Sequence, residues 1–209
     1  LLKLASLKEY GKKIKPKKVL WFYYEGNDLI DELPREKQSK ILLNYLNPGF
    51  TQSLTEKQEI LDAKLQEHAD KDQLLWETKI FRLYNLRSLL KFDSEYIDYK
   101  VNIDPLYNSI LEEAKRFVEL WGGKIEFIYI PQFERYKKNI EDNWEKNKVI
   151  SLVKKLNIRI IDLDEGLIKK DSDPLSYYPL KMHGTFIAEA NKNVAKYITD
   201  RSEEHTSEL

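Results

Sequence analysis

Residues 19–28 read VLWFYYEGND, and this stretch decides the fold class. Its first six residues are apolar, aromatic or β-branched, a pattern typical of a buried strand. Gly26, Asn27 and Asp28 then form a turn-prone polar triplet that presents hydrogen-bond donors and acceptors. In open α/β sheets, ligands bind beyond the carboxyl ends of the strands. We therefore expect Asn27 at a ligand-binding edge, where its amide can donate to a developing oxyanion.

Two further strand patterns follow, at residues 124–130 and 158–163, with helical patterns between them. The clearest helix begins at Asp104-Pro105, keeps a 3.6-residue apolar stripe and ends at Gly122-Gly123. The alternation of strand and helix predicts an α/β fold with a parallel sheet and right-handed crossovers. Other helices are expected at residues 3–14, 139–156 and 185–198.

The interval between the first and second strands is longer than a simple crossover needs. Within a domain spanning residues 1–200, we interpret residues 34–90 as a helical insertion, either a substrate lid or a packing appendage. Residues 201–209 lack apolar periodicity and match the translation of a common sequencing adapter, so they are interpreted as a non-native tail. The chain opens inside a helical pattern, which favours a fragment whose missing N-terminal portion holds another strand of the sheet.

Composition excludes several classes of protein. The 209 residues carry 35 basic and 35 acidic side chains, a balance that calls for neither nucleic acid nor an anionic membrane as a partner. Five lysines between residues 12 and 18 are interpreted as a solvated connection. The absence of cysteine excludes disulfides and thiol nucleophiles, and no apolar run reaches the ~18 residues of a membrane span. The compartment stays undecided.

Chemistry-bearing residues also lie far downstream, where residues 173–184 read DPLSYYPLKMHG. Asp173 and His183 fit a pair in which a carboxylate orients a His that activates a nucleophile. Asp171 is a competing carboxylate. Asp28 is expected to cap backbone amides, and His68 to be solvated. The three histidines have no metal-ligand spacing and no Gly-rich phosphate loop is present, so no cofactor is expected.

These blocks resemble the SGNH (GDSL-like) hydrolase superfamily, and more narrowly the bacterial SGNH-type proteins found with exopolysaccharide biosynthesis genes. The resemblance is carried by residues 19–28, 173–175 and 183–184, with flanking matches at 4–10, 15–17 and 45–46. It implies a three-layer α/β/α, flavodoxin-like sandwich and a serine nucleophile. It also implies that Asn27 is an oxyanion-hole side chain, His183 the general base and Asp173 the orienting acid.

The chain departs from the family pattern at two positions. Glu25 replaces the first Gly of the usual Gly-x-Asn-Asp block, and Leu180 replaces the acid usually found three residues before the His. The nucleophile and glycine blocks normally precede the first helix, and Ser6 lies inside a helical pattern, so the nucleophile is expected to be missing from this chain.

The full-length protein is therefore expected to be a serine esterase or acyltransferase that needs no cofactor. Its expected substrate is an acylated small molecule or a glycan carrying O-acyl groups. The alternative is a non-catalytic protein of the same fold that binds a glycan or assists polysaccharide assembly.

Overall fold

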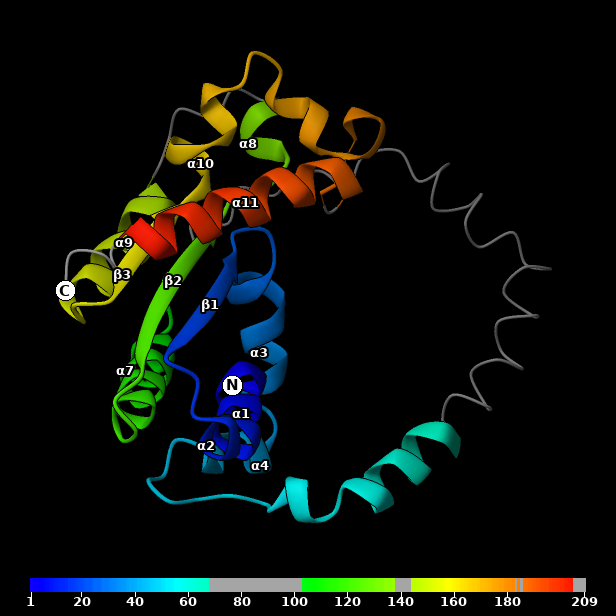
Figure 1. Ribbon diagram of the computed structural model, residues 1–209, viewed down its shortest axis with the longest axis vertical. Helices are drawn as coiled ribbons and strands as arrows, with labels where there is room; N and C mark the ends of the chain where they lie inside the picture. The colour runs from blue at the N-terminus through cyan, green and yellow to red at the C-terminus, as the bar shows by residue number, and fades with distance from the viewer. Residues whose placement is uncertain (68–102, 138–143, 183, 185, 205–209) are drawn as a thin grey trace. The chain divides into compact units, whose positions relative to one another are not determined.

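A computed structural model describes residues 1–67, 103–137, 144–182, 184 and 186–204. Within these residues, three parallel strands form one sheet: β1 (Lys18–Tyr24), β2 (Lys124–Ile130) and β3 (Arg159–Asp162). The strands lie side by side in the order β1-β2-β3 (Figure 1). The expected α/β class with a parallel sheet is confirmed.

The register aligns the carboxyl ends of the strands. Lys18 pairs with Lys124 and Tyr24 with Ile130, while Tyr129 pairs with Asp162 at the end of β3. β3 is shorter than the predicted strand at 158–163, because the Asp162 side chain accepts the N–H groups of residues 164 and 165 and starts a helix. The polar residues that follow each strand therefore meet at one edge of the sheet.

One face of the sheet packs against the N-terminal helical segment and two helices from the middle of the chain. The predicted helix at 3–14 is a continuous helical segment, divided into α1 (Leu2–Ser6), the π-helical turn η1 (Leu7–Gly11) and α2 (Lys12–Ile14). It packs with α7 (Pro105–Glu119) and α9 (Trp144–Lys155) over an aromatic core. In that core the Tyr23 ring stacks on Phe127, with ring centroids 5.6 Å apart.

The opposite face carries Ile128 and Ile161, which pack in a second apolar cluster. This cluster includes α10 (Leu163–Gly166) and α11 (Ala188–Glu204), and the short helix α8 (Glu134–Lys137) follows β2. In Figure 1, α11 crosses this side of the strands. Because α11 continues to Glu204, the first four residues of the predicted non-native tail are helical; their origin stays a prediction.

The chain divides into two compact units. The first consists of Leu1–Phe50 with Lys100–Leu209, and the second is Thr51–Tyr99. The predicted insertion at 34–90 falls partly in each unit. In the first unit, the turn after β1 leads into η2 (Asp28–Glu32), α3 (Leu33–Glu36) and α4 (Lys40–Asn44). There the fully buried Tyr45 donates a 2.6 Å hydrogen bond to Glu9. The second unit contains η3 (Leu54–Glu56) and a helix at 58–67, and residues 68–90 lie outside the described residues.

No helix in the described part of the chain combines the length and apolar character needed to cross a membrane.

Candidate functional site

Asn27 lies in the turn that follows β1, at the carboxyl edge of the sheet where the sequence predicts it. Its Nδ2 donates a 2.9 Å hydrogen bond to Glu32 Oε1. Its Oδ1 is buried and has no hydrogen-bond partner among the described residues. The amide that an oxyanion would need is therefore present at the expected edge, with one of its two N–H groups bound to a carboxylate.

Asp28, the next residue, holds the same turn. Its buried carboxylate pairs with Lys3 and accepts a backbone hydrogen bond from Tyr24. Burial raises the pKa of this carboxyl group, and the Lys3 charge opposes the shift. Lys3 Nζ also donates to the Phe22 carbonyl at 2.9 Å. These contacts occupy backbone groups on the side of β1 that faces away from β2.

Two hollows among the described residues bear on whether a substrate could bind at Asn27. The first, about 20 Å³, is lined by Asp28, Trp21 and Tyr107 among others, and it has room for little more than a water molecule. The second, about 330 Å³, lies along β3 beside Gly166 and Tyr197 of α10 and α11. Since β2 separates β3 from β1, the larger hollow is on the far strand of the sheet from Asn27. Neither hollow is therefore a substrate pocket at Asn27.

The segment with the downstream residues is anchored at the same edge as Asn27. It contains two short 3-10 helices, η5 (Pro174–Tyr177) and η6 (Pro179–Lys181). Between them, the buried Tyr178 donates a 3.2 Å hydrogen bond to the carbonyl of Pro131, the residue after β2. The structure thus brings residues 173–182 to the carboxyl end of β2.

The Asp173 side chain is 44% exposed, and its Oδ2 lies 2.6 Å from Lys181 Nζ. Its backbone N–H donates to Asp171 Oδ1 at 3.0 Å. His183 lies outside the described residues. A contact from His183 to Asp173 or Asn27 therefore stays a prediction, and the described partner of the Asp173 carboxylate is a lysine.

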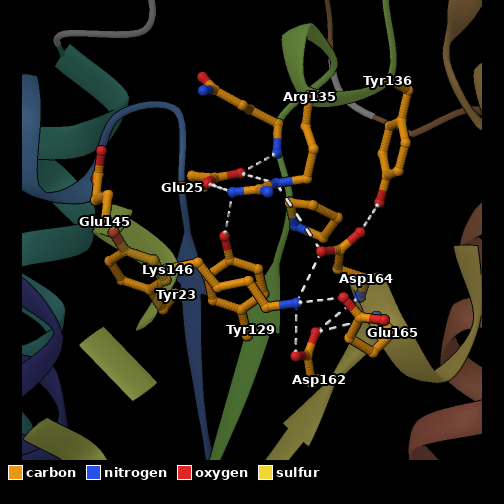
Figure 2. A network of polar contacts seen from close by, with 12 residues as sticks. Tyr23, Glu25, Tyr129, Arg135, Tyr136, Glu145, Lys146, Asp162, Asp164 and Glu165 are labelled. Carbon is orange, nitrogen blue, oxygen red and sulfur yellow. Dashed lines mark hydrogen bonds and ion pairs between the residues drawn. The ribbon is translucent and has the colours of Figure 1, made fainter. Parts of the chain in front are cut away.

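A buried polar network that no pattern in the sequence predicts lies at the same edge (Figure 2). Glu25 accepts the backbone N–H of Gln132 at 3.1 Å and the Nε–H of Arg135 at 3.0 Å, and it forms a buried ion pair with Arg135. Arg135 Nη2 also lies 3.4 Å from the Tyr129 hydroxyl. The residue that departs from the Gly-x-Asn-Asp pattern thus joins the turn after β1 to the turn after β2.

The network continues to the end of β3. Lys146 Nζ lies 2.8 Å from Asp162 Oδ2 and 2.7 Å from Asp164 Oδ2, and Tyr136 donates to Asp164 Oδ1 at 2.8 Å. Burial disfavours the ionised form of Asp164, but the hydrogen bonds from Lys146 and Tyr136 outweigh it and hold the pKa of this carboxyl group below its ordinary value. This part of the network is a set of satisfied ion pairs that fastens α9 to the end of β3.

Glu145, beside Lys146 at the start of α9, has weaker partners. The Tyr23 hydroxyl lies 3.4 Å from its Oε1, and Figure 2 shows the two side chains pointing toward each other. Burial raises the pKa of Glu145 to about 7, and the nearby Glu25 charge adds to the shift. A carboxyl group with a pKa near neutrality can accept or donate a proton under physiological conditions. No spacing in the sequence links Glu145 to Tyr23 or Glu25, 122 and 120 positions away, so sequence reasoning missed it.

The fold and this edge define an α/β protein whose parallel strands end in an Asn-containing turn and a buried ion-pair network. Scanning protein-family models, curated proteins and solved structures gave no match to the chain. Within the described residues, no group of three or more His, Cys, Asp or Glu side chains is arranged to hold a metal ion.

Proposed function

We propose that the full-length protein is an SGNH-type serine esterase or acyltransferase with a flavodoxin-like fold, acting on O-acyl groups of a glycan or a small molecule. The observation that carries the proposal is the meeting of two distant segments at one edge. Asn27 follows β1 there, and Tyr178 anchors the Asp173 segment to Pro131 after β2. Ligands of parallel α/β sheets bind at this edge.

The proposed chemistry assigns one role to each residue. A serine from the part of the full-length protein upstream of Leu1 attacks the acyl carbonyl, and His183 removes the proton of the serine hydroxyl. Asp173 orients His183, and Asn27 donates to the tetrahedral oxyanion. The Asn27 amide has two N–H donors, so one can donate to the oxyanion while the other stays bound to Glu32. The tetrahedral intermediate then collapses to an acyl-serine: its bond to the alcohol oxygen breaks, and His183 returns the proton to that oxygen so that the alcohol leaves. Water or a second hydroxyl group, deprotonated by His183, then attacks the acyl-serine, and the serine leaves with that proton.

Specific contacts favour a second candidate, a non-catalytic glycan-binding or polysaccharide-assembly protein. The Asn27 amide is bound to Glu32, and the Asp173 carboxylate to Lys181. Glu25, which stands where the Gly-x-Asn-Asp pattern has its first glycine, forms an ion pair with Arg135. A hydrogen bond from the candidate oxyanion-hole amide to a carboxylate is consistent with a protein that keeps the fold of the site but has lost its catalytic activity.

The test starts from the source DNA, by recovering the coding sequence upstream of Leu1 and expressing the longest frame. We expect a serine at the end of a strand, labelling by a fluorophosphonate probe and hydrolysis of p-nitrophenyl acetate. Asn27→Ala should lower the turnover number by about 10²–10³-fold, as removal of an oxyanion-hole donor does elsewhere. His183→Ala should abolish turnover.

A matched control is Asn108→Ala, since Asn108 also donates to a glutamate, Glu112 Oε1 at 2.7 Å, but on the exposed surface of α7. This variant should keep full activity. An upstream sequence without such a serine would refute the enzyme, and specific binding of an acetylated polysaccharide would then support the second candidate. The 209-residue chain alone should show no esterase activity; turnover lost on His183→Ala would contradict that expectation.

A further inference from the structure

The end of the sheet opposite to Asn27 carries a surface that is both basic and apolar. It comprises residues from α2, the connection to β1, the end of α7 and the start of β2. We call it the basic-apolar patch, and its members are Lys12, Lys13, Ile14, Lys15, Lys17, Leu120 and Lys124.

These residues come from segments more than 100 positions apart, and Trp121 holds the segments together. The Trp121 Nε1–H donates to the Pro16 carbonyl at 3.0 Å, and its ring lies against Gly11. Beside it, the Lys124 N–H donates to the Lys17 carbonyl at 2.9 Å. Ile14 lies between Gly11 and Pro16, and Leu120 directly precedes Trp121. These contacts bring the two segments that carry the patch together at the amino end of the sheet.

The charges of the patch are available to a partner. All five of its lysines are exposed, and none forms an ion pair with another described residue. The nearest acidic neighbour in sequence, Glu119, lies 3.5 Å from Lys115 of its own helix. Among basic groups at the other end of the sheet, by contrast, Arg135 and Lys146 are buried in ion pairs.

The two apolar residues of the patch are highly exposed for large aliphatic side chains. Ile14 is 71% exposed and Leu120 is 67% exposed, although Leu120 directly precedes a half-buried tryptophan. Large aliphatic side chains on a lysine-rich surface contribute little to binding a phosphate backbone or a polysaccharide. They do contribute to binding at a lipid surface, where the acyl chains begin just below the anionic headgroups.

The balanced net charge of the whole chain calls for no anionic partner, but the charge of this surface is locally basic. We propose that the basic-apolar patch docks the protein on an anionic phospholipid surface. The lysines are attracted to the negative surface potential, and Ile14 and Leu120 enter the boundary between headgroups and acyl chains. β1 has seven residues, so its length keeps the Asn27 turn about 20 Å from the patch, at the opposite end of the sheet. A glycan at Asn27 would thus be handled on the side away from the membrane. The membrane proposal does not depend on the proposed function, because no residue of the patch belongs to the candidate site.

The test is co-sedimentation of the 209-residue chain with vesicles of phosphatidylglycerol and phosphatidylcholine in equal parts, against vesicles of phosphatidylcholine alone. We expect binding to the anionic vesicles only, and weaker binding as salt is added. Lys13→Glu with Lys17→Glu should weaken binding by at least about tenfold. The matched control is Lys192→Glu with Lys196→Glu, which makes the same charge change on exposed positions of α11 and should bind as the unaltered chain does.

A second variant pair tests the apolar contribution. Ile14→Ser with Leu120→Ser leaves every charge in place and should weaken binding to the anionic vesicles, most clearly at high salt, where electrostatic attraction is screened. Circular dichroism of each variant checks folding. Equal loss in the patch and α11 charge variants would overturn the proposal. So would failure to bind anionic vesicles, or tighter binding to RNA or to an anionic polysaccharide than to the vesicles.

Discussion

Glu25 and Arg135 lie 110 positions apart in the chain and form a buried ion pair that joins the end of β1 to the helix after β2. Both side chains are at most 4% exposed. The same carboxylate accepts the N–H of Gln132. Because Asn27 is two residues from Glu25, this ion pair positions the turn on which the candidate site depends.

Removing one partner of this pair should destabilise the protein strongly. Arg135→Met leaves the Glu25 charge buried without its partner, and such losses cost about 3–5 kcal/mol. The free energy of unfolding from urea denaturation measures the effect. The control is Arg35→Met, since Arg35 pairs with Asp31 on the exposed surface of the first unit, and such pairs contribute less than about 1 kcal/mol. Similar values for the two variants would show that the buried pair contributes no more than a surface pair.

Glu145 should make stability depend on pH. Its folded-state pKa of about 7 lies above the ordinary value for glutamate, so the folded protein binds the proton more tightly than the unfolded chain does. The stability contribution of this proton is present at low pH and is lost as pH rises from the unfolded pKa through about 7. The groups facing it are Tyr23, Glu25 and Arg135.

Glu145→Gln removes this titration. We expect the variant to be more stable than the unaltered chain above pH 7, by about 2 kcal/mol after allowance for partial exposure, and equally stable near pH 4. Urea unfolding across pH measures the difference. Glu189→Gln makes the same change of side chain at an exposed position of α11 and is the control. A pH-independent effect of Glu145→Gln would contradict the assignment.

Lys3 should protect the outer edge of β1. It binds the Phe22 carbonyl and the Asp28 carboxylate, and the nearby Leu20 and Phe22 side chains are partly exposed. Lys3→Met frees a backbone acceptor beside apolar side chains, and unprotected strand edges pair with other chains. Size-exclusion chromatography with light scattering should show concentration-dependent association. Lys192→Met should elute as the unaltered chain does, and equal association of both variants would indicate a general effect of lost charge.

Two aspartates at the carboxyl edge should differ sharply in their effect on stability. Asp164 is fully buried against Lys146 and Tyr136, so Asp164→Asn should cost about 3 kcal/mol or more. The Asp173 side chain is 44% exposed beside Lys181, so Asp173→Asn should cost less than about 1 kcal/mol. Thermal unfolding checks both values. A loss of esterase activity in Asp173→Asn of the full-length protein would then report a role at the site, since its folding is intact.

Local patterns in the sequence determined much of the fold. The aromatic run before Gly26 became β1 within the predicted residues, and Asp104 caps the helix that begins at Pro105. Strands and helix caps depend on interactions among residues close in sequence. The residue types and spacings that favour these interactions can therefore be read from the sequence. The position of Asn27 at the edge of a parallel sheet follows from the same patterns.

Only the tertiary structure decided what each side chain at that edge contacts. It pairs Glu25 with Arg135, places the Glu145 carboxyl group beside Tyr23, engages the Asn27 amide with Glu32, and gathers the lysines of residues 12–17 beside Leu120 and Lys124. Most of these contacts join residues more than 100 positions apart. Their energies depend on burial and on the charges that neighbouring strands and helices bring together, and a linear pattern specifies neither.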